Sequence, residues 1–189
     1  MATRSALSEA ALRLTVERGL DQVRVEDIAA EAGVSPRTFN NYFSSKEEAV
    51  VAGGTDRGAN VRAAFRARPI DEPLWQALSH AFAELFPDEP DRAWLAKAKL
   101  LKAAPALMAE RLKSDASVER ALAQEIAERT GTDAERDLYP RLAAAAVVAA
   151  VHVAVDYWLD APATTTLRST LTRALQQVAA GLPHTADAR

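Results

Sequence analysis

Four polar side chains lie close together within residues 33–42: Arg37, Thr38, Asn40 and Asn41. On the surface of a helix, arginine can form paired hydrogen bonds with guanine and asparagine with adenine, both in the major groove of duplex DNA. Threonine adds a hydroxyl that can bond to bases or to phosphate oxygens. The segment therefore has the chemistry to read base pairs, provided that a helix presents these side chains together.

A short helix is predicted just before this segment, over residues 25–32. Its apolar residues fall on one face, and Glu26 and Asp27 lie in its first turn, where the helix dipole favours acidic side chains. Gly33 can adopt the left-handed conformation that ends a helix. The helix is therefore bounded at both ends.

A second short helix is predicted to begin at Pro36, a residue that suits the first helical position, with Ser35 as its N-cap. Phe39 and either Tyr42 or Phe43 would then face the core. Two short helices that meet at a glycine are the layout of a helix-turn-helix. An ordinary helical corner has the same layout, so geometry alone leaves both interpretations open.

The segment over residues 25–50 reads VEDIAAEAGVSPRTFNNYFSSKEEAV. It closely resembles the N-terminal DNA-binding segment of the tetracycline-repressor family of bacterial regulators. A first helix predicted over residues 5–18, with Gly19 as its stop, agrees with that family. So does the fourth helix, predicted to open with a capping box of Ser45 and Glu48 and to run to about residue 66.

The resemblance implies a DNA-binding transcriptional regulator: a homodimeric repressor that a small hydrophobic ligand releases from a palindromic operator. By position in the motif, it implies DNA contacts from Ser35, Arg37, Thr38, Asn41, Tyr42 and Lys46. Arg37 and Asn41 are expected on base edges. Lys46 is expected on phosphate, so its loss should weaken binding to all DNA sequences alike.

Two positions depart from the family pattern. Arg24 replaces the threonine that usually caps the second helix; it can reach phosphate but cannot cap. Asn40 replaces a common aromatic residue, which suggests a base preference shifted towards adenine. A solvated polar turn of helix is the alternative interpretation of Asn40.

The rest of the chain predicts an all-α fold. Prolines and glycines separate further helices expected over residues 74–86, 92–104, 106–129, 140–159 and 164–180, and no strand pattern occurs. The total of nine helices agrees with the family's three-helix head and six-helix body. We expect a helix-turn-helix domain over residues 1–48 and a ligand-binding and dimerisation domain over residues 49–189.

Residues 142–155 are apolar nearly all round, which predicts burial on more than one side. Together with the last helix they could form a four-helix bundle across a two-fold axis, as the family implies. The expected dimer residues are Val148, Val151, Val155, Leu167, Leu171, Leu175 and Val178. A core helix within one chain is the alternative.

Apolar and aromatic residues on the central helices could line a ligand cavity. The candidates are Trp75, Phe82, Phe86, Trp94, Leu101, Met108 and His152. Most such stripes are simply core. A diffuse resemblance to actinobacterial branches of the family that sense fatty acids or acyl-coenzyme A esters suggests a long-chain acyl ligand, with drug-like aromatics or cations as competitors.

The composition argues against an enzyme. The chain has no cysteine, and His80, His152 and His184 lie far apart without the spacing of a metal site. It has neither a glycine-rich phosphate loop nor a nucleophile motif. We therefore expect no catalytic activity, no cofactor and no metal.

The lack of a recognisable targeting signal predicts a cytoplasmic protein. The N-terminus lacks a signal-peptide pattern, and the apolar residues 142–155 are fewer than the ~20 that a bilayer requires, so no membrane partner is expected.

The net charge of -3 gives no overall basic signature. A helical lipid or small-molecule carrier, or a scaffold without DNA readout, is therefore the alternative to a DNA-binding regulator.

Overall fold

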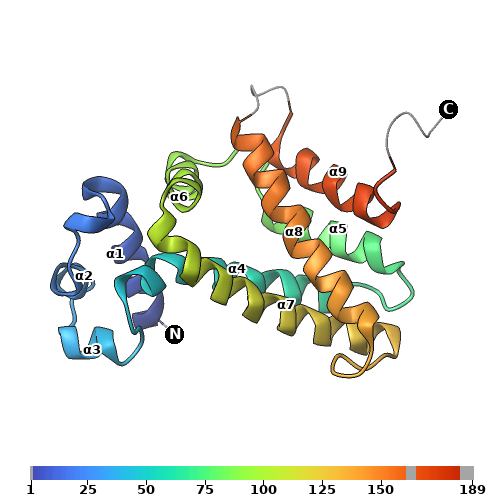
Figure 1. Ribbon diagram of the computed structural model, residues 1–189, viewed down its shortest axis with the longest axis horizontal. Helices are drawn as coiled ribbons and strands as arrows, with labels where there is room; N and C mark the ends of the chain where they lie inside the picture. The colour runs from blue at the N-terminus through green and yellow to red at the C-terminus, as the bar shows by residue number, and fades with distance from the viewer. Residues whose placement is uncertain (1, 161–164, 184–189) are drawn as a thin grey trace. The chain divides into compact units, whose positions relative to one another are not determined.

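The computed structural model describes residues 2–160 and 165–183, with only the main chain for residues 2 and 53–57. In these ranges the chain forms nine α-helices, two 3-10 helices and no strand (Figure 1), so the predicted all-α fold is confirmed. The α-helices are α1 (Ala2–Arg18), α2 (Val25–Glu31), α3 (Pro36–Asn40), α4 (Lys46–Arg66), α5 (Leu74–Leu85), α6 (Arg92–Ala103), α7 (Met108–Thr130), α8 (Leu138–Asp160) and α9 (Leu167–Ala179). The 3-10 helices are η1 (Leu20–Gln22) and η2 (Pro105–Leu107).

The chain divides into two compact units. The first comprises Met1–Arg57 and Arg92–Asp115, and the second comprises Gly58–Asp91 and Ala116–Arg189. By packing, α6 and the start of α7 therefore group with the N-terminal helices. The expected boundary after residue 48 separates the chain by function, not by packing, and it stays a prediction.

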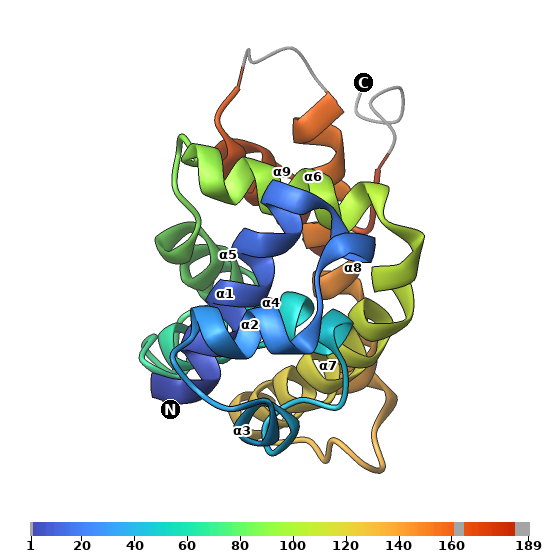
Figure 2. The same cartoon turned by 90° about the vertical axis from the view of Figure 1, so that its left-hand side faces the viewer.

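One apolar core holds the first unit together. Leu7 and Leu14 of α1 and Ile28 of α2 are at most 2% exposed in this core. α6 packs on α1 (Figure 2), and Leu107 of η2 is fully buried in the same core. The α6–η2 segment, which the sequence assigned to the body, is thus part of the unit that carries the two short helices.

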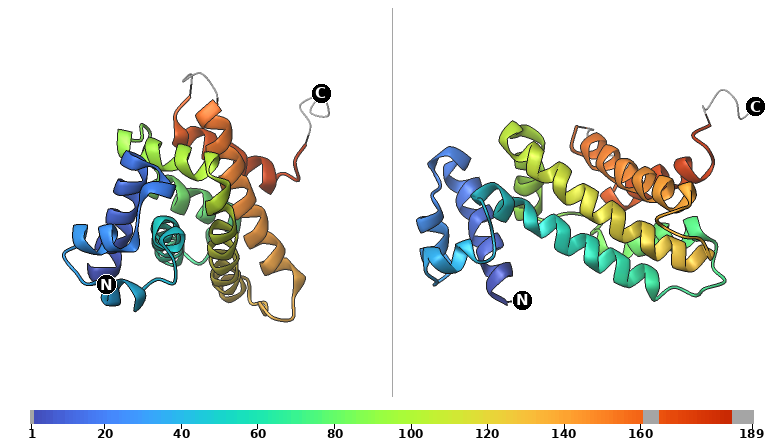
Figure 3. Two further views of the ribbon diagram at one scale, coloured as in Figure 1. Left: turned by 60° about the vertical axis from the view of Figure 1, so that its left-hand side comes forward. Right: turned by 60° about the horizontal axis from the view of Figure 1, so that its bottom comes forward.

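The second unit is built around α9, which packs against both α5 and α8 (Figure 3). Leu167, Leu171 and Leu175 recur every four residues on α9 and are at most 1% exposed. They form the apolar stripe by which an amphipathic helix binds its neighbours. α9 begins at Leu167, later than predicted, because Thr166 caps it by accepting a hydrogen bond from the N–H of Ser169 at 3.1 Å. The predicted start, residue 164, lies outside the described residues.

α8 matches the helix predicted over residues 140–159 and extends it by two residues at the start and one at the end. Pro140 is its third residue, where a missing N–H breaks no helical hydrogen bond, so this proline opens the helix without a kink. α8 has 23 residues, and an 18-residue stretch of it has a mean hydropathy of 1.8, so by length and composition alone it could cross a membrane. Core helices of soluble proteins pass the same test.

α4 and α7 approach closely where Gly58 faces Val118. A Cβ atom at Gly58 would lie 2.9 Å from Cγ2 of Val118, closer than real Cβ contacts. The valine side chain is stiff and cannot move aside at low cost. The absence of a side chain at Gly58 therefore allows this helix pair to pack.

Candidate nucleic-acid interface

The start of α3 is fixed by its predicted cap. The hydroxyl of Ser35 accepts a hydrogen bond from the N–H of Thr38 at 3.1 Å, and Pro36 is the first helical residue. The Oγ atom of Ser35 also lies 2.9 Å from Oγ1 of Thr38. These contacts define where the short helix begins and hold the Thr38 hydroxyl against it.

Two phenylalanines anchor α3 to the core. Phe39 and Phe43 are at most 2% exposed, and their ring centroids lie 5.7 Å apart. Tyr42 is 42% exposed, so Phe43 and not Tyr42 is the second core residue. The sequence left these two open because both fit the helical spacing.

The other face of α3 and its C-terminal turn is exposed. Arg37, Asn40, Asn41 and Tyr42 all lie on the surface. Among the described residues, no carboxylate forms an ion pair with Arg37. The exposed face therefore presents a guanidinium and two carboxamides, which are the groups that pair with base edges.

The turn between α2 and α3 has the left-handed geometry predicted at Gly33. Its φ is +69°, a conformation that costs side-chain-bearing residues free energy. The N–H of Gly33 donates to the Ala30 carbonyl at 3.1 Å, and that of Val34 donates to the Ala29 carbonyl at 2.9 Å. These bonds satisfy carbonyls at the end of α2 and set the angle at which α3 leaves it.

The start of α2 is capped by a residue that sequence reasoning missed. The carboxylate of Asp27 accepts a hydrogen bond from the main-chain N–H of Arg24 at 3.0 Å. Asp27 therefore satisfies a terminal N–H although the Arg24 side chain has no acceptor atom. The spacing of three residues, as in a capping box, was the available signal. The Arg24 side chain itself is exposed.

Lys46, the first residue of α4, is engaged inside the first unit. Its Nζ donates to the carbonyl of Leu20 at 2.7 Å and to that of Val23 at 2.9 Å. An ammonium has three N–H donors, so these bonds leave one of them. The expectation of a dedicated phosphate contact took no account of these carbonyls.

The capping of α4 differs in one partner from the predicted box. Ser45 accepts a hydrogen bond from the N–H of Glu48 at 3.0 Å, as expected. The carboxylate of Glu48, however, accepts from the N–H and the hydroxyl of Ser44, at 2.8 and 2.7 Å, rather than from Ser45. It thereby ties α4 to the loop that follows α3.

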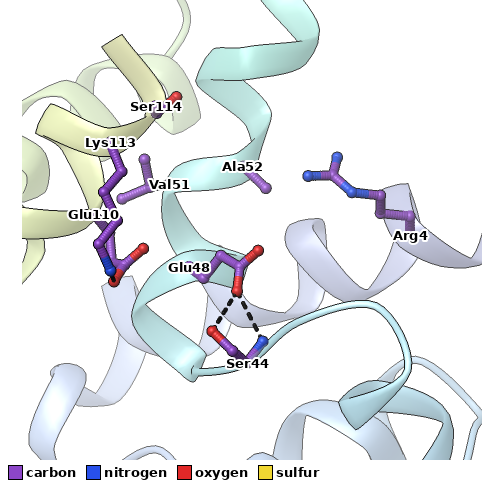
Figure 4. A pocket seen from close by; sticks show the side chains of 8 residues that line it. All are labelled: Arg4, Ser44, Glu48, Val51, Ala52, Glu110, Lys113 and Ser114. Atoms are coloured by element: carbon purple, nitrogen blue, oxygen red, sulfur yellow. Dashed lines mark hydrogen bonds and ion pairs between the residues drawn. The ribbon is translucent and has the colours of Figure 1, made fainter. Parts of the chain in front are cut away.

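A pocket of about 310 Å³ lies beside this cap in the first unit (Figure 4). Its lining residues are Arg4, Ser44, Glu48, Val51, Ala52, Glu110, Lys113 and Ser114. Lys113 donates to Glu110 at 2.6 Å, and this hydrogen bond raises the pKa of Lys113. None of the residues expected to bind ligand lines this pocket.

The residues expected to bind ligand fall in different units. Trp75, Phe82, Phe86 and His152 belong to the second unit, whereas Trp94, Leu101 and Met108 belong to the first. Leu101 is partly buried and packs against the core of the first unit. Met108 is 42% exposed.

The expected dimer residues differ in how deeply they are buried. Leu167, Leu171 and Leu175 are at most 1% exposed and Val148 is 8% exposed, all within one chain. Side chains already buried inside a chain offer no surface to a second copy. Val151, Val155 and Val178 are half-buried and keep some exposed surface.

Comparison with known families matches both parts of the chain. Residues 7–52 match the family described as bacterial regulatory proteins, tetR family. Residues 72–183, more than half of the chain, match the family described as MftR C-terminal domain.

Individual relatives agree with these matches. The chain is 33% identical over 164 residues to the HTH-type transcriptional regulator TcmR of Streptomyces glaucescens, which covers 82% of this chain and 73% of that protein. A TetR-family regulator from Syntrophomonas wolfei has a TM-score of 0.66 at 17% identity, with 97% of both chains covered. Thermus thermophilus FadR, a TetR-family repressor solved with lauroyl-CoA, has a TM-score of 0.60 at 23% identity, with 96% of this chain and 95% of that chain covered. At such identities these structures establish the shared fold.

Proposed function

This chain belongs to the tetR family of DNA-binding bacterial regulators, and we propose that it is a homodimeric repressor that a hydrophobic effector releases from a palindromic operator. It is a transcriptional regulator and not an enzyme. A carrier or scaffold without DNA readout is not favoured, because the family and the fold neighbours are regulators. As a DNA-binding bacterial regulator it would act in the cytoplasm.

The observation that carries the DNA-binding part is the two-sided construction of α3. Phe39 is fully buried on one side, while Arg37, Asn40 and Asn41 are exposed on the other. A helix held in this way can enter the major groove without losing its place in the core. We propose base contacts by Arg37 and Asn41, with Asn40 adding a preference for adenine. Further contacts are proposed from Arg24, Ser35, Thr38 and Tyr42.

Selection from a randomised duplex library tests this assignment. Wild-type protein should enrich a palindrome whose half-sites lie one or two helical turns apart, because a two-fold dimer imposes its symmetry on the site. Footprinting should show the same dyad. An enriched site without dyad symmetry would contradict the dimer, and no enrichment at all would contradict sequence-specific binding.

The dimer is proposed to form through the exposed face of α8. Leu138, Leu142, Val153 and Tyr157 are between 57 and 76% exposed and recur at helical spacing along that face. The opposite face of α8 is buried within the chain, at Ala144 and Val147 among others. An exposed apolar stripe of this length is typical of a protein interface. Val151 and Val155 stay in the proposal as half-buried neighbours.

The effector is proposed to be an acyl chain or acyl-coenzyme A bound in the second unit. Phe82 on α5 and Phe86, the C-cap of that helix, are at most 7% exposed with ring centroids 6.2 Å apart. Trp75 and His152 lie half-buried in the same unit. The lauroyl-CoA held by the Thermus thermophilus neighbour supports this class of ligand. Binding would favour the conformation with low DNA affinity and so shift the population towards it.

Titration of the protein–operator complex with lauroyl-CoA, lauric acid and coenzyme A tests the effector class. Release by the acyl compounds but not by coenzyme A supports a hydrophobic effector. Phe82→Leu should weaken the response to lauroyl-CoA and leave operator affinity without ligand unchanged. If none of the three compounds releases DNA, and native mass spectrometry finds no carried lipid, the acyl proposal is wrong.

A further inference from the structure

Lys46 links the two ends of the segment that contains the helix-turn-helix. Its Nζ lies 2.7 Å from the carbonyl oxygen of Leu20 and 2.9 Å from that of Val23. α2, α3 and both of their connecting turns lie between Val23 and Lys46 in the chain. The two hydrogen bonds therefore join the residue that follows this segment to the residues that precede it.

Both ends of this contact are rigid. Leu20 is 9% and Val23 is 1% exposed, and both belong to the apolar core of the first unit. The carbonyl of Leu20 also accepts the N–H of Val23, at 3.3 Å, at the end of η1. At the other end, Lys46 begins α4, and Ala49 and Val50, about one turn further along this helix, are fully buried. A bond between two fixed ends constrains whatever lies between them.

A lysine at this position needs a local reason. The first turn of a helix carries a partial positive charge from the dipole, so an ammonium there is unfavourable by itself. Carbonyls at the end of a 3-10 helix carry partial negative charge and keep lone pairs that can accept a further donor. The Lys46 ammonium satisfies two of them, which explains a half-buried cation at the start of α4.

We infer that Lys46 is a positioning residue, which sets how α3 is presented to DNA rather than mainly neutralising a phosphate. This inference rests on the proposed function of α3 in base readout. A positioning role predicts two effects of losing Lys46 that a phosphate contact does not predict. Loss of Lys46 lowers the preference for operator over random DNA, and it leaves the salt dependence of binding unchanged.

The contrast comes from what each kind of contact does. A lysine on phosphate releases counterions, so its loss changes the slope of log K against log [salt] by about 0.9 and weakens all sequences alike. A residue that aligns α3 affects base contacts, each of which discriminates by about 1–3 kcal/mol, roughly 5- to 150-fold. The two roles therefore differ in measurable quantities.

The test compares Lys46→Met with wild type on the duplex that wild type selects from a random library and on a scrambled duplex. Salt titrations give the slope for each protein. We expect the operator-to-scrambled affinity ratio to fall by about tenfold or more, with the slope unchanged. In the free protein, the amide NMR resonances of Arg37 and Asn41 should shift, although the rest of the spectrum shows a folded chain.

Arg24→Gln is the matched control. Arg24 is exposed, precedes the same helix pair, and is proposed to contact phosphate, so its loss should change the slope by about 0.9 with the affinity ratio preserved. The resonances of Arg37 and Asn41 in free protein should stay in place. This pair of variants separates alignment from charge neutralisation.

Lys46→Arg keeps the test decisive if Lys46→Met does not fold. Arginine retains the charge and would preserve a phosphate contact, but its longer side chain and the fixed fork of its donors do not fit the geometry of the two ammonium bonds. A reduced affinity ratio with an unchanged slope supports positioning, and behaviour like wild type overturns it. A changed slope with a preserved ratio for Lys46→Met also overturns it. The proposed function fails separately, if wild type itself selects no sequence.

Discussion

The carboxylate of Glu72 accepts two hydrogen bonds from the guanidinium of Arg68, from Nε at 2.7 Å and from one Nη at 2.9 Å. Nδ1 of His80 lies 2.6 Å from the same carboxylate. Arg129 of α7 donates to the carbonyls of Pro69 and Glu72, the latter at 2.9 Å. The connection between α4 and α5 is therefore held by charged side chains rather than by an apolar core.

This arrangement predicts a pH-dependent contribution of Glu72 to stability. The guanidinium of Arg68, with a smaller contribution from His80, lowers the pKa of Glu72 from its usual 4.5 to about 2. A carboxyl with a depressed pKa stabilises the folded state above pH 4.5, and this contribution is lost as the pH falls towards 2. Glu72→Gln should therefore lower Tm at pH 7, and the difference from wild type should shrink below pH 4.5.

Thermal melts followed by circular dichroism between pH 7 and pH 3 measure that difference. Glu128→Gln, which changes an exposed glutamate of α7, is the control and should show little difference at any pH. A difference for Glu72→Gln that stays constant across the range would contradict the assigned pKa.

The close approach at Gly58 predicts a reversal of the usual effect of alanine in a helix. Glycine to alanine normally favours a helix by about 1 kcal/mol. Here the new Cβ would meet Val118 at 2.9 Å, so Gly58→Ala should instead destabilise the chain by about 1–3 kcal/mol. Urea unfolding measures whether Gly58→Ala raises or lowers the free energy of unfolding.

The double variant Gly58→Ala, Val118→Ala separates the clash from the helix propensity. Removing the valine methyls makes room, so Gly58→Ala should cost less in the Val118→Ala background than in wild type. Equal effects in both backgrounds would show that the two residues do not interact.

Arg37 carries the sharpest prediction on DNA. Arg37→Ala should cost about 1–3 kcal/mol of operator binding and relax the base preference at one position, because it removes a paired contact to a base. Arg120→Ala, which removes an exposed arginine of α7 in the second unit, is the control. Equal losses of Arg37→Ala on operator and scrambled duplexes would place Arg37 on phosphate.

The proposed dimer surface predicts opposite effects for two apolar residues of the second unit. Val153 is 67% exposed, so Val153→Glu should dissociate the dimer and keep the monomer folded. Leu171 is 1% exposed, so Leu171→Ala should lower stability by about 2–5 kcal/mol. Sedimentation velocity measures the first effect and urea unfolding the second.

Ile70→Glu is the control for the dimer experiment. Ile70 is 74% exposed in the connection between α4 and α5 and is not part of the stripe on α8, so its substitution should leave the sedimentation coefficient unchanged. Dissociation by Ile70→Glu as well, or a dimer that survives Val153→Glu, would argue against α8 as the interface.

The sequence by itself determined the local features of this protein. The Ser35 cap, the left-handed Gly33 and the buried Phe39 depend on residues within a few positions of one another, so their spacing was enough to predict them. The all-α fold followed from the same short-range patterns. The family resemblance then gave these features a function.

Tertiary structure decided what depends on residues far apart in the chain. Apolar spacing shows that Leu107 and Leu171 face something, but not whether that partner is the first unit, another helix or a second copy. From the sequence, Lys46 looks like a cation without a partner. The two carbonyls that it binds lie 26 and 23 residues away and belong to the main chain, so no side chain in the sequence indicates them. Burial and backbone acceptors are properties of the folded chain, and for that reason only the structure could assign them.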